Sequence, residues 1–260
     1  MSDPTAPQEA PQETFISHLI ELRSRLLRAI VAVVLVLLCL FPWAKDIYAL
    51  LAAPLLRALP KGATMIATDV TGTFFVPLKV TLMAAFLLAL PYVLWQAWAF
   101  VAPGLYHHEK RLAMPVIVSS FVFFLIGMAF AYFLVFPIAF GFFAAYTPVG
   151  VTMMTDIDKY LSFVLTMFIA FGLTFEVPVV VIVLVRLRIV TLEKLQSIRP
   201  YVIVGAFVAG AIFTPPDVVS QLLLAVPMWL LYELGMLMAR VMVPPPQEAA
   251  VDPEGETAAK

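Results

Sequence analysis

The sequence has few charged residues and a single cysteine for its length. Asp, Glu, Lys and Arg make up 13% of the 260 residues, and 63% are hydrophobic, whereas soluble domains carry about 25% charged residues. The formal net charge of −1 gives no support for nucleic-acid binding. Cys39 alone excludes an internal disulfide. Because the hydrophobic residues come in blocks, these shortages predict a polytopic membrane protein.

Motifs for covalent chemistry are also missing from the sequence. It contains neither the nucleotide-binding run G-x-x-x-x-G-K-[ST] nor H-E-x-x-H. His107 and His108 are adjacent, which is a poor spacing for two ligands of one metal on a helix. The pair Ser119-Ser120 has no histidine nearby in sequence. An intramembrane enzyme is therefore the least favoured class, and we expect no catalytic residue, cofactor or metal.

Apolar segments predict an all-α protein with six membrane helices. They run over Leu26–Trp43, Phe75–Val101, Leu112–Tyr132, Tyr160–Val185, Tyr201–Thr214 and Val218–Met238. Residues 15–240 would form this membrane domain. The polar residues 1–14 lack the basic start of a secretory signal, so we expect no cleaved leader. Residues 241–260 are acidic and rich in proline, and we expect both tails to be disordered and cytoplasmic.

The apolar run of the third segment continues to Tyr146, which is too long for one crossing. Pro137 and Gly141 are expected to break it, leaving a cap outside the membrane. On the same side, the loop Ala44–Phe74 should contain a short amphipathic stretch and a turn at Pro60-Lys61-Gly62.

Positive charges predict the orientation, since cytoplasmic loops carry an excess of Lys and Arg. One side has ten, namely Arg23, Arg25, Arg28, Lys110, Arg111, Arg186, Arg188, Lys194, Arg199 and Arg240. The other has five, namely Lys45, Arg57, Lys61, Lys79 and Lys159. Both termini are therefore predicted to be cytoplasmic.

The fifth and sixth segments are expected to be short. Fourteen residues in the fifth give a helix of about 21 Å, against a hydrocarbon core of about 30 Å. The sixth has fifteen residues before Glu233, or about 22 Å. Pro215-Pro216-Asp217 joins them without room for a loop. Such a hairpin either thins the bilayer or hides its ends in protein; alternatively Arg199 snorkels and nothing is thinned.

A carboxylate interrupts the apolar stretch FGLTFEVPVVVIVL at Glu176. A charge at the bilayer centre costs about 2.5–3.5 kcal/mol or more. Pro178 removes the N–H that would bond to the carbonyl of Thr174, and Gly172 eases bending, so we expect a kink. Because ionisable residues in membranes mark functional sites, Glu176 is interpreted as a site for a proton or for a foreign transmembrane helix.

Other polar side chains lie at matching depths. Gln96 is in the second segment, and Thr214 and Gln221 flank the turn between the fifth and sixth. Such groups either bond neighbouring helices together or bind a foreign helix. For Gln96 the first interpretation is preferred.

The stretch SHLIELRSRLLRA before the first segment is amphipathic. His18, Glu21, Arg25 and Arg28 form one stripe of the helix, and Glu21 can pair with Arg25 four residues later. Arg23 falls on the apolar stripe. From pattern alone, an interfacial helix with a snorkelling arginine is expected.

The second segment ends in QAWAFVAPGLYHHEKR. Trp95, Trp98 and Tyr106 fit an aromatic belt at the membrane interface, and Glu109 lies in the short loop that follows. Glu21 and Glu109 therefore offer two acidic groups on a mostly basic surface. A carboxylate can hold a guanidinium with two parallel hydrogen bonds, but pattern alone leaves open whether that guanidinium is the protein's own.

These motifs resemble the TatC family, the receptor subunits of the twin-arginine protein translocase. The resemblance runs in order over residues 14 to 240. It is carried by SHLIELRSRLL, APLL, MIATDV, WQAWAFVAPGLYHHEKR, IGMAFAYF, FGLTFEVPV, RPYVIVGAFVAGAIFTPPDVVSQ and AVPMWLLYELG.

The resemblance implies a six-helix, glove-shaped protein of the bacterial inner membrane. Such a protein binds signal peptides with paired arginines and helps to export folded proteins, driven by the proton gradient. Carried over to this sequence, the signal-peptide site consists of Glu21 and Glu109, with Arg23, His18 and Phe100 nearby.

The resemblance also implies a multimeric complex with TatA and TatB, subunits that have one transmembrane helix each. Glu176, Thr214 and Gln221 are candidates to meet a polar residue of such a helix, and the short fifth segment would match a short partner. The main alternative is a proton-coupled small-solute transporter with Glu176 as the proton carrier, although the halves show no convincing repeat.

Overall fold

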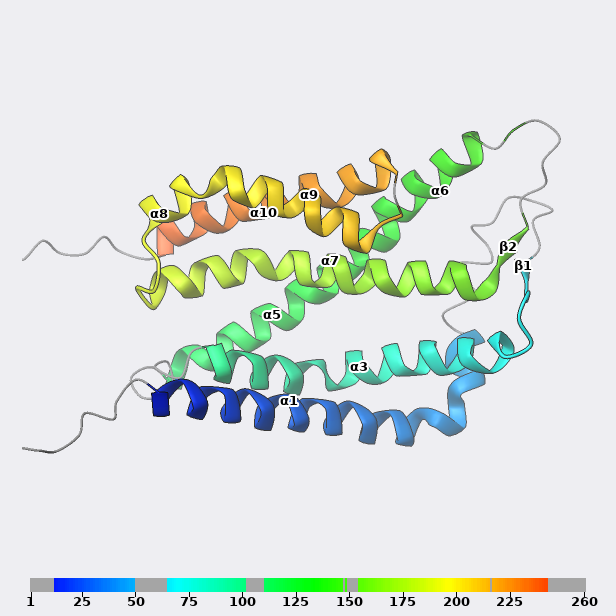
Figure 1. Ribbon diagram of the computed structural model, residues 1–260, viewed down its shortest axis with the longest axis horizontal. Coiled ribbons are helices and arrows are strands. Elements are labelled where there is room, and N and C mark those ends of the chain that lie inside the picture. Colours follow the sequence, from blue (N-terminus) through cyan, green and yellow to red (C-terminus); the bar gives the residue numbers. More distant parts are fainter. Residues whose placement is uncertain are drawn as a thin grey trace, which may run out of the picture.

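The computed structural model describes residues 12–49, 65–101, 110–146, 148, 154–215 and 217–242. Long helices run from one end of the molecule to the other (Figure 1). The first residues of α1 and the last of α10 lie at the same end, which we call the terminal end. The other end, with β1 and β2, is the opposite end. Glu109, the turn at 60–62 and nearly all of both tails lie outside the described residues.

The structure confirms all six predicted segments as helices. Five are long and apolar enough to cross a membrane, and α9 is a shorter apolar helix. In chain order the elements are α1 (Gln12–Leu40), the 3₁₀ turn η1 (Phe41–Trp43), β1 (Met65–Ile66), α3 (Gly72–Val101), α5 (Lys110–Phe130), the π turn η2 (Ala131–Val135), α6 (Phe136–Ala145), β2 (Thr155–Asp156), α7 (Ile157–Arg186), α8 (Leu192–Ser197), α9 (Arg199–Phe213) and α10 (Val218–Met242). The two-residue strands pair in parallel.

The first helix differs from the pattern-based expectation of a separate interfacial helix. α1 runs without a break from Gln12 to Leu40, so the amphipathic stretch and the first membrane segment are one helix. No glycine or proline interrupts this sequence, and its Leu, Ala, Arg and Glu residues favour helix. Pro42, within η1, comes directly after this uninterrupted stretch.

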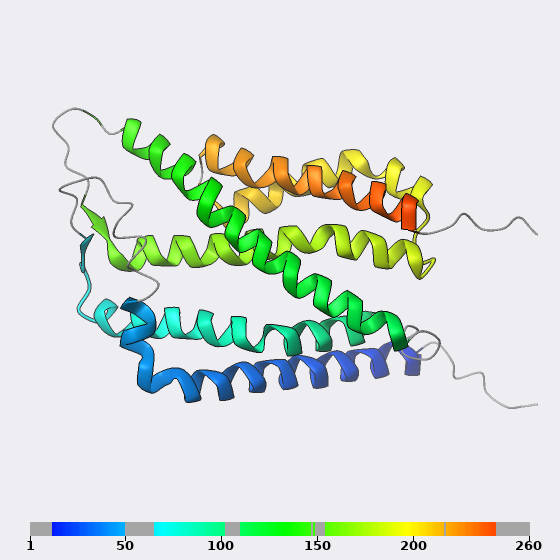
Figure 2. The same ribbon diagram turned by 180° about the vertical axis from the view of Figure 1, so that it is seen from behind.

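The break expected at Pro137 is wrong. α5, η2 and α6 form one inclined helix that crosses over α7 (Figures 1 and 2). In η2 the turn is wider, and the N–H of Phe136 donates to the carbonyl of Ala131, five residues back. A π turn of this kind sits inside a helix without ending it, and the missing N–H of one proline bends a helix more readily than it stops it. Because this helix is inclined relative to its neighbours, it can contain a longer apolar run than a helix parallel to them.

The core of the bundle is built around α7. Two thirds of its most apolar window is buried (67%), whereas none of the corresponding window of the first helix is. α7 packs against α5 and α10, while α1 packs almost entirely against α3. The first helix is therefore peripheral, and α7 is enclosed by its neighbours.

Two glycines allow α5 and α10 to approach the backbone of α7 closely. A Cβ on Gly127 of α5 would lie 2.4 Å from the carbonyl oxygen of Phe171 in α7. A Cβ on Gly235 of α10 would lie 2.8 Å from the Cα of Pro178. Small residues let membrane helices approach this closely, so the crossings of α5 and α10 over α7 depend on these glycines.

The sixth helix is longer than expected. α10 has 25 residues and continues past Glu233. The Glu233 carboxylate is paired, since its Oε2 accepts a hydrogen bond from Nη2 of Arg199 at 2.7 Å. α9 has 15 residues, or about 22 Å of helix. The fifth helix is therefore short as predicted, and the sixth is not.

Candidate functional site

At the terminal end, the carboxylate of Glu21 is held by Arg25. Nε and Nη2 of Arg25 both donate to Oε1 of Glu21, at 2.8 and 2.6 Å. This confirms the pairing predicted from their spacing along α1. The Glu21 side chain is 37% exposed, and partly exposed pairs four residues apart contribute only about 0.3–0.5 kcal/mol. The contact with Arg25 therefore contributes little to the stability of α1.

A ring contact joins the start of α1 to the end of α3. The imidazole of His18 stacks on Phe100 with ring centroids 4.4 Å apart and an interplanar angle of 21°. His18 is three residues before Glu21 on the helix, so two of the predicted site residues meet close to the third. Arg23 is exposed. Glu109 precedes Lys110, the first residue of α5, but lies outside the described residues.

Inside the bundle, three helices contribute to a polar cluster around Glu176. This residue of α7 is 7% exposed, and among the described residues neither of its carboxyl oxygens has a hydrogen bond of regular geometry. Ser120 of α5 lies beside the carboxyl. Nε1 of Trp98 in α3 donates to Oγ of Ser120 at 2.9 Å. The indole N–H, the serine hydroxyl and the carboxyl thus come from α3, α5 and α7.

Sequence analysis missed Trp98 and Ser120 as parts of this cluster. Trp98 was assigned to the interfacial belt, whereas its N–H points to Ser120, which is fully buried. A serine in the apolar run of α5 was the available signal, since a hydroxyl in lipid seeks a partner on a neighbouring helix.

Gln96 of α3 is 4% exposed. Its amide oxygen has no hydrogen-bond partner among the described residues. Buried polar atoms are normally satisfied, so this oxygen gives no direct support to the interpretation that Gln96 bonds neighbouring helices together.

Thr214 and Gln221 are brought together by the α9–α10 hairpin. The hydroxyl of Thr214 donates to the carbonyl of Gly210 at 2.8 Å. Nε2 of Gln221 donates from α10 to the carbonyl of Phe207 in α9 at 2.9 Å. Both bonds end on the α9 backbone and not on Glu176, so the predicted polar set falls into two groups.

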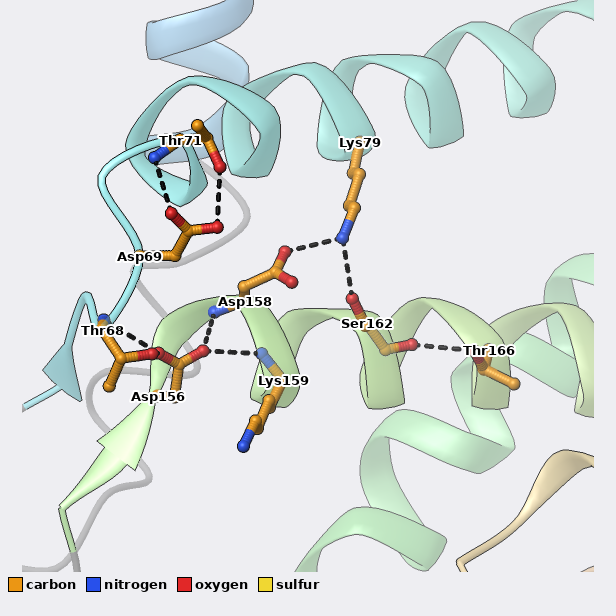
Figure 3. A network of polar contacts seen from close by, with 9 residues as sticks. All are labelled: Thr68, Asp69, Thr71, Lys79, Asp156, Asp158, Lys159, Ser162 and Thr166. Atoms are coloured by element: carbon orange, nitrogen blue, oxygen red, sulfur yellow. Dashed lines mark hydrogen bonds and ion pairs between the residues drawn. The ribbon is translucent and has the colours of Figure 1, made fainter.

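The opposite end contains a polar network between α3 and α7 (Figure 3). Nζ of Lys79 donates to Oδ1 of Asp158 at 2.6 Å and to Oγ of Ser162 at 3.2 Å. The backbone N–H of Thr68 donates to Oδ2 of Asp156 at 3.0 Å, and the Thr68 hydroxyl donates to the same oxygen. The bonds of Lys79 connect α3 to α7, and those of Thr68 connect the segment before α3 to the start of α7; all join residues about 80 or more positions apart.

Asp156 is the N-cap of α7. Its side chain accepts from the backbone N–H groups of Asp158 and Lys159 as well as from Thr68. The Thr68 hydroxyl, followed by these backbone donors, lowers the pKa of Asp156 from 3.8 to about 2, because each bond favours the ionised form.

Within the part of the chain that the structure describes, no group of three His, Cys, Asp or Glu residues is placed to hold a metal ion. Five helices long and apolar enough to cross a membrane, with the shorter apolar helix α9, define a multi-pass helical membrane protein.

Comparisons with known proteins give the family. The profile described as Sec-independent protein translocase protein (TatC) matches residues 17–227. The Azotobacter chroococcum protein of that name is 59% identical over 233 residues, 90% of each chain. The Escherichia coli K12 protein is 55% identical over 231 residues, 89% of this chain and 90% of the relative. The chain belongs to the TatC family, the receptor component of the twin-arginine translocase; it is a transport protein and not an enzyme.

A solved structure agrees with this assignment. It is described as the crystal structure of the twin arginine translocase receptor TatC, and it matches with a TM-score of 0.76 and 40% sequence identity. The match covers 86% of this chain and 98% of the other.

Proposed function

We propose that this protein binds the twin-arginine signal peptides of folded proteins at its terminal end. Glu21 and Glu109 receive the two guanidinium groups. The observation that carries the proposal is the contact of Arg25 with Glu21, in which one carboxylate oxygen accepts from both Nε and Nη2 of an arginine. The carboxylate thus has the surroundings to hold a guanidinium, and the one now present belongs to the same helix.

The stack of His18 on Phe100 supports the proposal that both carboxylates belong to one site. It ties the start of α1 to the end of α3, and Glu109 follows in the segment that leaves α3. Arg23, exposed on α1, lies near the bound peptide in this proposal. Arginine is selected over lysine because a planar fork offers paired donors to a carboxylate, while an ammonium is a point charge.

The terminal end faces the cytoplasm of a bacterial cell in this proposal, with the protein in the inner membrane. The excess of Lys and Arg on that side supports it. Both chain ends are then cytoplasmic, which is where a signal peptide arrives before export.

Single-helix subunits of the TatA and TatB type are the proposed partners in the membrane, in a multimeric complex. The carboxyl of Glu176 supports this, because it is buried without a regular hydrogen bond among the described residues. Thr214 and Gln221 lie beside the short helix α9, which suits a short partner helix. Small-solute transport by Glu176 is not proposed further, since the family is one of protein translocases.

Peptide binding to the purified full chain tests the site. Glu21→Gln and Glu109→Gln are each expected to weaken binding of a twin-arginine peptide by about tenfold or more, since removing one partner of a charge pair costs about 2 kcal/mol or more. Glu193→Gln is the matched control, because Glu193 is an exposed carboxylate of α8 at the same end. Wild-type affinity in both site variants would refute the assignment.

Assembly with single-helix subunits tests the second proposal separately. Glu176→Gln keeps the shape of the side chain and replaces the ionisable carboxyl with a neutral amide that cannot carry a charge. We expect reduced co-purification of the partner subunits and unchanged peptide affinity. A variant that keeps its partners but loses the peptide would contradict the division of the polar residues between two sites.

A further inference from the structure

A groove of about 240 Å³ lies between α5, α7 and α10 towards the terminal end. Its floor is formed by α7 residues that include Pro178, Val179 and Val183, all of which are buried. Val116 contributes to the α5 wall. The hydroxyl of Ser119, which also lines the groove, donates to the carbonyl of Val116 at 2.9 Å. None of these wall residues therefore needs a hydrogen bond from a bound molecule.

A charged side chain, that of Arg186, lies at the mouth of the groove. Arg186 lines it and is the last residue of α7, while Met242, also at the groove, is the last residue of α10. Among the described residues lining the groove, Arg186 alone carries a charge. An apolar trough with a guanidinium where its helices end matches the two-part chemistry of a lipid.

We propose that this groove binds one phospholipid of the leaflet at the terminal end, with an acyl chain over Pro178 and Val183 and its phosphate against Arg186. Guanidinium groups hold phosphate oxygens through paired donors. Basic pockets between transmembrane helices are established places for lipid headgroups in membrane proteins generally.

The size and walls of the groove disfavour two other occupants. A transmembrane helix is about 10–12 Å across with its side chains, too wide for a cavity of 240 Å³. The chain's own residues 243–260 follow Met242, but they carry Glu248, Asp252, Glu254 and Glu256, and burying carboxylates among apolar walls is unfavourable.

The lipid would support the packing of α5 and α10 on α7. These two helices meet α7 closely at Gly127 and Gly235, and the groove is the space left between them on the way to the terminal end. A ligand that binds only the folded state stabilises it in proportion to its occupancy, so thermal stability should depend on added phospholipid.

Native mass spectrometry of the full chain, delipidated in mild detergent and titrated with phosphatidylglycerol, tests the proposal. Val116→Trp and, independently, Ser119→Leu fill the groove from the α5 side, and Arg186→Gln removes the phosphate contact. We expect the wild type to bind one phospholipid with a rise in Tm. The filled variants should lose at least about fivefold in affinity, equivalent to about 1 kcal/mol.

Two control variants make the same substitutions at nearby positions outside the groove. Val118→Trp adds the same bulk to an exposed position of α5, 53% exposed and away from the groove, and Arg188→Gln removes an exposed charge just beyond α7. Both are expected to bind lipid like the wild type. Equal affinity of the filled variants and the wild type would overturn the proposal. So would a gain of tenfold or more in a chain ending at Met242, since the tail would then be the occupant.

Discussion

The two ends of the bundle use polar side chains in different ways. At the opposite end, Lys79 of α3 bonds to Asp158 of α7, so a polar contact fastens two helices. At the terminal end, Glu21 is held by Arg25 on its own helix. A bond within one helix can be exchanged without loosening the packing of helices. The comparison teaches that Glu21 can give up Arg25 to a ligand without loosening the helix packing, whereas Lys79 with Asp158 at the opposite end, like Arg199 with Glu233 in the terminal half, joins two different helices.

The largest loss of stability is expected from a substitution at the crossing of α5 and α7, which lies between the two ends. Gly127→Ala would place a Cβ 2.4 Å from the Phe171 carbonyl oxygen, and overpacking of this kind costs about 1–3 kcal/mol. Gly141→Ala is the control, because nothing lies within 4 Å of its added Cβ, and alanine favours helix over glycine by up to about 1 kcal/mol. Chemical unfolding in detergent measures both; equal stabilities would show that α5 and α7 do not need the close approach.

A smaller effect is expected from the ion pair at the opposite end. Lys79 and Asp158 are 40% and 37% exposed, so a double-mutant cycle with Lys79→Gln and Asp158→Asn should give a coupling of about 0.2–1 kcal/mol in stability. Peptide affinity should stay unchanged in all three variants. Loss of peptide binding would mean that the two ends are not independent.

At the terminal end, Arg25→Gln is expected to raise the affinity for a twin-arginine peptide by up to about fivefold, because a competitor worth at most about 1 kcal/mol is removed. Arg28→Gln, one turn further along the same stripe, should change it less. Isothermal titration of both variants compares them. A lower affinity in Arg25→Gln would make Arg25 part of the peptide site instead of its placeholder.

The smallest effect concerns the cap of α7. Since the pKa of Asp156 is lowered from 3.8 to about 2 in the fold, its contribution to stability is present above pH 4 and is lost as pH falls towards 2. Asp156→Asn should lower Tm at neutral pH and flatten the decline of Tm between pH 4 and 2. Asp46→Asn, at an exposed position, is the control. An unchanged acid profile in Asp156→Asn would exclude this role.

The helices could be predicted from the sequence because a membrane leaves an apolar run few alternatives. All six segments are confirmed, with ends shifted by a few residues in most of them. The pairing of Glu21 with Arg25 could also be predicted, since it depends only on positions within one helix.

The features that pattern did not reveal depend on contacts between distant segments. The partner of Glu233 is Arg199, 34 residues earlier, a contact that the sequence pattern did not predict. Trp98 meets Ser120 across two helices, 22 residues apart. The helix through Pro137 continues because a π turn precedes the proline. The family resemblance named His18 and Phe100 as neighbours of the signal-peptide site, but their stacking on each other was not predicted.

The most direct test of guanidinium capture is a double-mutant cycle between the protein and its ligand. Binding of a twin-arginine peptide, and of peptides with either arginine replaced by lysine, is measured with the wild type and with Glu21→Gln. We predict that the wild type prefers arginine at both positions by about tenfold or more, and that Glu21→Gln loses this preference at one of them. If Glu21→Gln discriminates lysine from arginine at both positions as strongly as the wild type does, Glu21 does not hold a guanidinium of the signal peptide.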